Sequence, residues 1–135
     1  MKRCVFIGHR NYVGQRTQIR EIIVDLMRRG VGEFYSGGMG NFDRACEHIV
    51  KELHGVLVYV PYHKTKIKTT DILHYNRIVN IFGDKPYEKS DIPVRNQWMV
   101  DHCDICLCYV GKPGGAMHTL RYAIEKGKPI INLFP

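Results

Sequence analysis

The sequence predicts an α/β fold, specifically a Rossmann-like three-layer α/β/α sandwich with a mostly parallel sheet of about six strands. Three observations predict it. Short apolar runs alternate with segments in which apolar residues recur at helical spacing. Glycines follow several of those helical segments. Two glycine-rich turns each connect an expected strand to an expected helix. The 135 residues suit one domain, residues 1–135.

The first half of the chain has the strand–helix–strand–helix–strand order of a nucleotide-binding half. Apolar residues such as Ile19, Ile23 and Leu26 recur at helical spacing, and Gly30 follows that helix. The expected elements are a strand at 4–8, a helix at 15–29, a strand at 34–36, a helix at 42–53 and a strand at 56–60.

The second half begins with a weaker pattern and then regains its alternation. Residues 62–90 are expected to be mostly loop, with one short strand at 78–82. Ser90 or Asp91 can cap the next helix, and Pro93 suits its first turn. The remaining expected elements are a helix at 91–103, a strand at 104–110, a helix at 117–126 and a strand at 129–134.

The composition is that of a globular cytoplasmic protein. Apolar runs are no longer than about six residues, far below the roughly 18 needed to cross a bilayer, so no membrane partner is expected. Residues 1–3 lead into a strand and do not read as a signal peptide. Five cysteines without an export signal indicate reduced thiols. Cys103, Cys106 and Cys108 are expected to pack in the core, and no metal site is predicted.

The two glycine-rich turns, 36–43 and 111–119, predict a site for an anion. Glycines between a strand and a helix let backbone N–H groups approach a ligand, and the helix N-terminus adds a positive dipole end. The net charge of +7 also favours an anionic partner, whether a nucleotide, a phosphosugar or a nucleic acid. Neither turn matches the phosphate-binding P-loop or the Gly-x-Gly-x-x-Gly pattern.

Polar residues next to these turns complete the predicted site, because ligands lie beyond the carboxyl ends of parallel strands. Lys112 adds charge to the second turn. Arg95 and Asn96 fall early in a helix, from which they could reach either the ligand or a loop. The candidate binding residues are Gly8, His9, Arg10, Ser36, Gly37, Gly38, Gly40, Asp43, Arg95, Asn96, Gly114, Gly115 and Thr119.

Two carboxylates are the candidates for catalysis. Asp43 lies in the first turn of its helix, where it could bind ribose hydroxyls or merely favour the helix dipole. Glu47 follows one helical turn later and could lie beside Asp43. A pair of carboxylates is the arrangement that glycosidic-bond chemistry uses.

Taken in order, these motifs resemble the SLOG superfamily, and the YpsA-like branch in particular, over nearly the whole chain. The motifs are Gly8-His9-Arg10, residues 36–43, residues 95–101 and Pro113-Gly114-Gly115 with Thr119. The resemblance implies a Rossmann-like fold and a nucleotide-related ligand held by both turns. It also implies a homo-oligomer, since members of the superfamily commonly self-associate.

Branches of the superfamily differ in activity, and their motifs can be compared with the residues of this chain. Relatives that release the base from a nucleoside monophosphate carry Pro-Gly-Gly-x-Gly-Thr followed by glutamates. This chain lacks the later glycine, has Thr119 displaced by one position, and carries Arg121 where an acid is expected. The Arg95-Asn96 pair is similar to one in the DNA-processing branch, whose members bind single-stranded DNA.

Three functions follow from these observations. The first is a sensor or binding module for AMP, ADP-ribose or an NAD-related ligand, with no turnover and no additional cofactor. The second is an N-glycosidic-bond hydrolase or transferase that uses Asp43 and Glu47. The third is a binder of single-stranded nucleic acid, which the positive charge favours.

Overall fold

The computed structural model describes residues 1–135 and contains one six-stranded, all-parallel sheet in the order β4-β3-β2-β1-β5-β6. The strands are β1 (Lys2–Gly8), β2 (Val31–Ser36), β3 (Val56–Tyr59), β4 (Arg77–Ile78), β5 (Ile105–Tyr109) and β6 (Ile130–Asn132). The helices are α1 (Arg16–Arg28), α2 (Asn41–Glu52), α3 (Thr69–His74), α4 (Asp91–Asp101) and α5 (Gly115–Glu125), with a short 3-10 turn at Lys64–Lys66. The predicted Rossmann-like α/β fold is confirmed.

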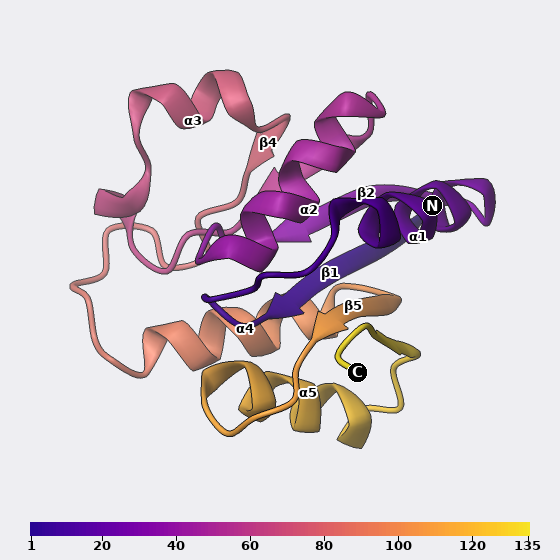
Figure 1. Ribbon diagram of the computed structural model, residues 1–135. Coiled ribbons are helices and arrows are strands. Elements are labelled where there is room, and N and C mark those ends of the chain that lie inside the picture. Colours follow the sequence, from indigo (N-terminus) through magenta and orange to yellow (C-terminus); the bar gives the residue numbers. More distant parts are fainter.

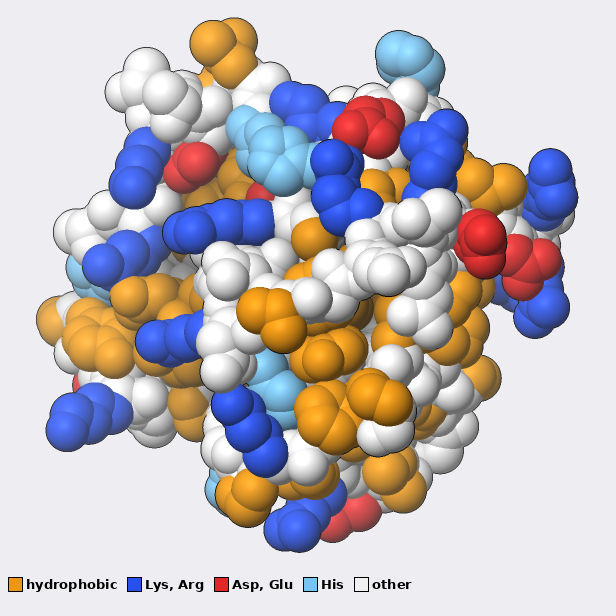
Figure 2. All heavy atoms as spheres, in the orientation of Figure 1, with side chains coloured by type: hydrophobic (Ala, Val, Ile, Leu, Met, Phe, Trp, Pro, Cys, Tyr) orange, Lys and Arg blue, Asp and Glu red, His pale blue; other side chains and the backbone are white.

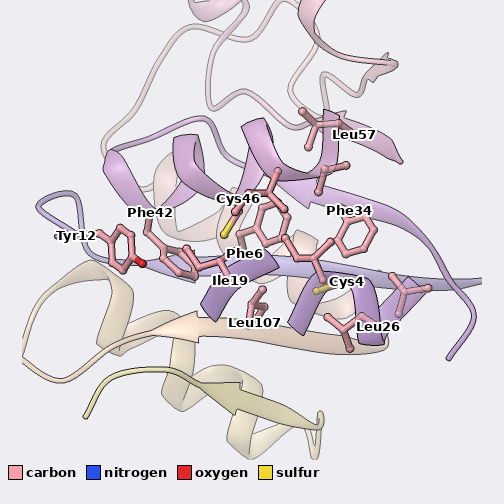
Figure 3. Packing of buried hydrophobic residues seen from close by; sticks show 14 residues of the cluster. Cys4, Phe6, Tyr12, Ile19, Leu26, Phe34, Phe42, Cys46, Leu57 and Leu107 are labelled. Carbon is pink, nitrogen blue, oxygen red and sulfur yellow. The ribbon is translucent and has the colours of Figure 1, made fainter. Parts of the chain in front are cut away.

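Helices cover both faces of the sheet, as a three-layer sandwich requires (Figure 1). In β1, Cys4 and Phe6 belong to the core beneath α1 and α2, whereas Val5 and Ile7 belong to the core beneath α4 and α5. Successive side chains of a strand point to opposite faces, so a continuous apolar run fills both cores. Figure 3 shows the first of these clusters, with the aromatic rings of Phe6 and Phe34 packed beside the α1 side chains.

The strand order reverses direction at the centre of the sheet. The chain leaves β1 toward β2 through α1 on one face, and it leaves β5 toward β6 through α5 on the other (Figure 1). The carboxyl ends of β1 and β5 lie side by side, with Gly8 paired to Tyr109. Connections that depart in opposite directions leave a crevice between them, which is where open parallel sheets bind their ligands.

The segment at 62–90 differs most from its prediction. It contains α3, whose six residues are too few to show a helical repeat, although Asp71 accepts a hydrogen bond from the Lys68 N–H at its N-terminus. The fourth strand is only Arg77–Ile78, rather than 78–82. Beyond it, the Phe82 N–H donates to the Asn80 side chain, a local turn that takes the chain out of the sheet.

Other boundaries shift by a few residues. α5 begins at Gly115 rather than at Met117, and β6 ends at Asn132, after which the Phe134 ring packs against the Tyr109 ring. All five cysteines are buried, and the predicted core packing of Cys103, Cys106 and Cys108 is confirmed. No helix of the protein combines the length and the apolar character that a bilayer crossing demands.

Candidate functional site

A cleft of about 370 Å³ lies at the carboxyl ends of the central strands, and both glycine-rich turns contribute to it. Gly37 and Met39 come from the first turn, and Lys112, Gly115 and Ala116 come from the second turn and the start of α5. The predicted site residues that line the cleft are Gly8, His9, Arg10, Gly37, Asp43, Arg95, Asn96, Gly115 and Thr119. Segments far apart in the sequence therefore meet at one concave surface.

Four predicted site residues, Ser36, Gly38, Gly40 and Gly114, shape the turns without lining the cleft. Ser36 Oγ accepts a hydrogen bond from the Gly38 N–H at 3.0 Å. Gly40 has a φ of +90°, and a Cβ there would collide with the Arg10 backbone. Glycine at position 40 is therefore what allows the first turn to pack against the loop that follows β1.

The N-terminus of α5 opens toward the cleft without a side-chain cap. Gly114 is its N-cap, with a φ of +139° that glycine accommodates. The first N–H to bond back to the turn belongs to His118, so the amides of the first helical residues have no intrahelical partner. Gly115 and Ala116 present this positive end of the helix to the cleft.

Basic side chains surround the same space. Arg10 and Lys112 line the cleft from the loops after β1 and β5. Lys112 Nζ donates to Asn11 Oδ1 at 3.2 Å, which joins the two loops. Asn11 also lines the cleft, although its sequence position beside Arg10 was the only signal that pointed to it. With Arg95, three cations face one carboxylate, Asp43, so the cleft attracts anions.

Arg95 is a buried structural tie as well as a source of charge. Its guanidinium donates to the carbonyls of Gly37 at 3.1 Å and Val60 at 2.8 Å, and its Nε donates to Asn96 Oδ1 at 2.7 Å. Burial lowers the pKa of Arg95, while the nearby Asp43 carboxylate acts in the opposite direction. Of the ligand and loop contacts predicted for Arg95, the structure shows the loop contacts.

Asp43 lies at the base of the cleft with one carboxylate oxygen held by the protein. Oδ2 accepts the Met39 N–H at 3.0 Å, and Oδ1 has no hydrogen-bond partner within the chain. Burial raises the pKa of Asp43 to about 7, against the Met39 hydrogen bond, which lowers it. A carboxyl group in this state can accept or donate a hydrogen bond near neutral pH.

His9 orients the second turn. The Gly111 N–H donates to His9 Nε2 at 3.0 Å, so the neutral ring carries its hydrogen on Nδ1. Burial, helped by the charge of Lys112, lowers the pKa of His9 and keeps the ring neutral. The ring also meets Tyr109 and Phe134 edge to face, which fixes its direction. His9 thus contributes a single free donor, Nδ1–H, to the site.

Glu47 lies behind the first turn and does not line the cleft. Its carboxylate accepts hydrogen bonds from Ser36 Oγ at 2.5 Å and Tyr75 Oη at 2.9 Å, and it lies 3.0 Å from His74 Nε2. These partners come from β2 and from the end of α3. The spacing of Asp43 and Glu47 places them on one face of α2, but only Asp43 reaches the cleft.

Comparison with known proteins identifies the fold. No family model and no curated protein matches the sequence. The structure is similar to DNA processing protein A from Streptococcus pneumoniae, with a TM-score of 0.76 at 16% identity, covering 97% of this chain and 50% of that one. DNA processing protein A from Helicobacter pylori matches with a TM-score of 0.73 at 17% identity, covering 97% and 64%.

A third similar structure is the molybdenum cofactor binding protein from Rippkaea orientalis, with a TM-score of 0.72 at 16% identity, covering 99% of this chain and 77% of that one. This chain spans half the length of the pneumococcal protein. These similarities show that the proteins share a Rossmann-like α/β fold with this chain. The predicted Rossmann-like fold is thereby confirmed.

Proposed function

We propose that this protein binds a nucleotide or a nucleotide-derived small molecule in the cleft and does not transform it. The observation that carries the proposal is the uncapped N-terminus of α5, which opens into the same cleft as Arg10 and Lys112. Free amides, a helix dipole and two cations around one space are the usual elements of a phosphate site.

The rest of the cleft suits the sugar of a nucleotide. Asp43 Oδ1 and His9 Nδ1 are an acceptor and a donor without partners in the chain, and both residues line the cleft. Sugar hydroxyls can satisfy both. Small-molecule sites measure roughly 300–1,000 Å³. A cleft of about 370 Å³ is near the lower end of that range and suits a mononucleotide.

Binding without turnover is favoured over glycosidic-bond cleavage by the contacts of Glu47. That carboxylate is committed to Ser36 and Tyr75 and faces His74, away from the cleft. Asp43 is then the single carboxylate that meets the ligand, whereas glycosidic hydrolysis ordinarily uses two. Release of free base from a bound nucleotide would overturn this part of the proposal.

Single-stranded nucleic acid is the second candidate, because the net charge is +7 and Lys and Arg side chains are dispersed over the face that Figure 2 shows. Of the similar structures, the H. pylori protein is described as binding single-stranded DNA and the R. orientalis protein as binding molybdenum cofactor. Both support a binding role for this fold, one for each class of partner. The cleft volume of about 370 Å³ favours a small ligand.

Calorimetric titration with AMP tests the proposal through two substitutions. A Cβ at Gly115 would meet no atom within 4 Å, so Gly115→Ala should fold normally while its methyl group narrows the approach to the α5 amides. Lys112→Ala removes a cation from the cleft. Each should weaken AMP binding about tenfold or more, which corresponds to one charge-assisted contact.

The matched control for Lys112→Ala is Lys128→Ala, which removes the same charge just before β6, at the opposite end of the sheet. That control should leave AMP affinity unchanged. Failure of AMP to bind at all, or equal affinities in Gly115→Ala, Lys112→Ala and Lys128→Ala, would contradict the proposed site. Analysis of the titrated sample for free adenine tests turnover.

A further inference from the structure

A second hollow of about 300 Å³ lies between the N-terminal turns of α4 and α5. It shares Ile92, Asn96, Gly115 and Thr119 with the cleft. The two hollows therefore adjoin each other at the start of α5. We call the second hollow the α4–α5 groove, and Gln97 and His118 are the side chains that belong to it alone and carry free polar groups.

The chemistry of the groove differs from that of the cleft. No lysine, arginine, aspartate or glutamate lines it, so away from the start of α5 it offers no charged side chain to a ligand. The Gln97 amide and the His118 ring have no side-chain hydrogen-bond partner in the chain, and both residues are exposed. Asn96 Oδ1 accepts from Arg95 Nε, which leaves the Asn96 amide N–H groups free to donate. The groove therefore offers polar hydrogen-bonding groups from Asn96, Gln97 and His118.

We propose that the α4–α5 groove is a second subsite that takes the neutral, polar group on the far side of a pyrophosphate. The inference rests on the proposed function and specifies its ligand class. With phosphates at the amides of Gly115 and Ala116, one nucleoside occupies the cleft and reaches Asp43. A sugar or a second nucleoside then enters the groove, where Gln97 and His118 hydrogen-bond to it.

The arrangement of the two hollows supports a ligand with two groups, one on each side of its phosphates. The α5 N-terminus lies at the junction, since Gly115 and Thr119 belong to both hollows. A ligand with its anion in the middle and a neutral group at each end matches that order of surfaces. A mononucleotide occupies the cleft and leaves the groove open to water. The preferred ligand is therefore a pyrophosphate-linked nucleotide of the ADP-ribose type.

Calorimetry with AMP and ADP-ribose on the wild type, Gln97→Ala and His118→Ala tests this subsite. The wild type should bind ADP-ribose about tenfold more tightly than AMP. Each substitution should weaken ADP-ribose binding about three- to tenfold and leave AMP binding unchanged, because AMP does not enter the groove. Gln18→Ala, an exposed glutamine on α1, is the matched control and should change neither affinity.

The outcomes separate the subsite from the site itself. Tight AMP binding without a gain for ADP-ribose would overturn the second subsite and leave the proposed function standing. Equal losses of AMP and ADP-ribose affinity in Gln97→Ala and His118→Ala, with unchanged melting temperatures, would likewise show that the groove is not a separate subsite. Absence of binding for both nucleotides would overturn the subsite and the proposed function together.

Discussion

Burial shifts the pKa values of Asp43 and His9, two side chains that line the cleft, in opposite directions. Desolvation raises the pKa of Asp43 to about 7 and lowers the pKa of His9, since in both cases water stabilises the charged form better than the protein does. Burial and the charge of Lys112 lower the pKa of His9 and keep its ring neutral, whereas Asp43 changes charge near neutral pH. The local surroundings of His9 and Asp43 thus set the protonation states that a ligand encounters when it binds in the cleft.

Asp43→Asn should change how stability depends on pH. Between the ordinary value of 3.8 and about 7, folded wild-type protein holds a proton on Asp43 that the unfolded chain has lost. Its stability therefore falls as pH rises through that window, by an amount on the order of 2–4 kcal/mol, while the asparagine variant lacks this loss. Urea unfolding of both proteins from pH 4 to 8 measures the difference, and the contribution of His9 cancels. Parallel profiles would contradict the buried, raised-pKa state.

Gly8 and Gly115 are a pair of glycines with opposite expected responses to alanine. A Cβ at Gly8 would enter the space of the buried Phe42 ring, while one at Gly115 would meet open space. Gly8→Ala should cost about 1–3 kcal/mol, the usual penalty for overpacking, and Gly115→Ala should be close to neutral. Denaturant titrations of the two variants measure their free energies of unfolding. A stability of Gly8→Ala equal to that of the wild type would contradict the prediction and mean that Phe42 has room to move.

At the scale of elements, α4 is joined to the first glycine turn by the Arg95 guanidinium. It bridges the Gly37 carbonyl, in the turn after β2, and the Val60 carbonyl, after β3. α3 supports the same turn from behind, because Tyr75 and His74 contact Glu47 and Glu47 accepts from Ser36. The turn that lines the cleft is therefore positioned by two helices that follow it in sequence by tens of residues.

Arg95→Met should destabilise the protein while keeping most of the side-chain volume. The carbonyls of Gly37 and Val60 lose a charged donor and stay buried, which costs about 2–4 kcal/mol. Arg121→Met, on the exposed surface of α5, serves as the control and should stay within about 0.5 kcal/mol of wild type. Amide hydrogen exchange should quicken at residues 37–40 in the first variant only. Unchanged exchange there would show that the turn holds its shape without Arg95.

At the scale of the whole molecule, binding through the net charge of +7 and binding in the cleft should depend differently on salt concentration. Dispersed surface cations attract any polyanion, and such binding weakens steeply with salt because counterions are released. A ligand in the cleft depends on oriented amides and on two neighbouring cations, Arg10 and Lys112. Salt dependence therefore separates surface attraction from occupation of the cleft.

AMP affinity should change by about threefold or less between 50 and 300 mM salt, whereas a single-stranded oligonucleotide should lose about tenfold or more. Fluorescence anisotropy of the labelled oligonucleotide and calorimetry of AMP measure the two responses. Excess AMP should not displace the oligonucleotide. Tight oligonucleotide binding at 300 mM salt that AMP abolishes would make the cleft a nucleic-acid site instead.

Much of the fold could be predicted from the sequence because the information is local. Apolar runs, helical spacing and terminal glycines define the order of the main elements, and parallel strands bring their carboxyl ends to one edge. The short elements could not be predicted in this way. α3 spans less than two helical turns, and β4 has only two residues, paired to Val58 and Tyr59.

The sequence by itself determined the Rossmann-like architecture and the meeting of Gly37 and Gly115 at one cleft, because backbone periodicity and strand polarity are sufficient for both. Only the tertiary structure decided which polar side chains face that cleft. Asp43 and Glu47 are equivalent by helical spacing, yet Ser36, His74 and Tyr75 engage the Glu47 carboxylate. Asp43 accepts only the Met39 N–H, through Oδ2, and keeps Oδ1 for the cleft. Hydrogen-bond partners from distant segments decide which carboxylate faces the cleft, and a local sequence pattern gives no information about such partners.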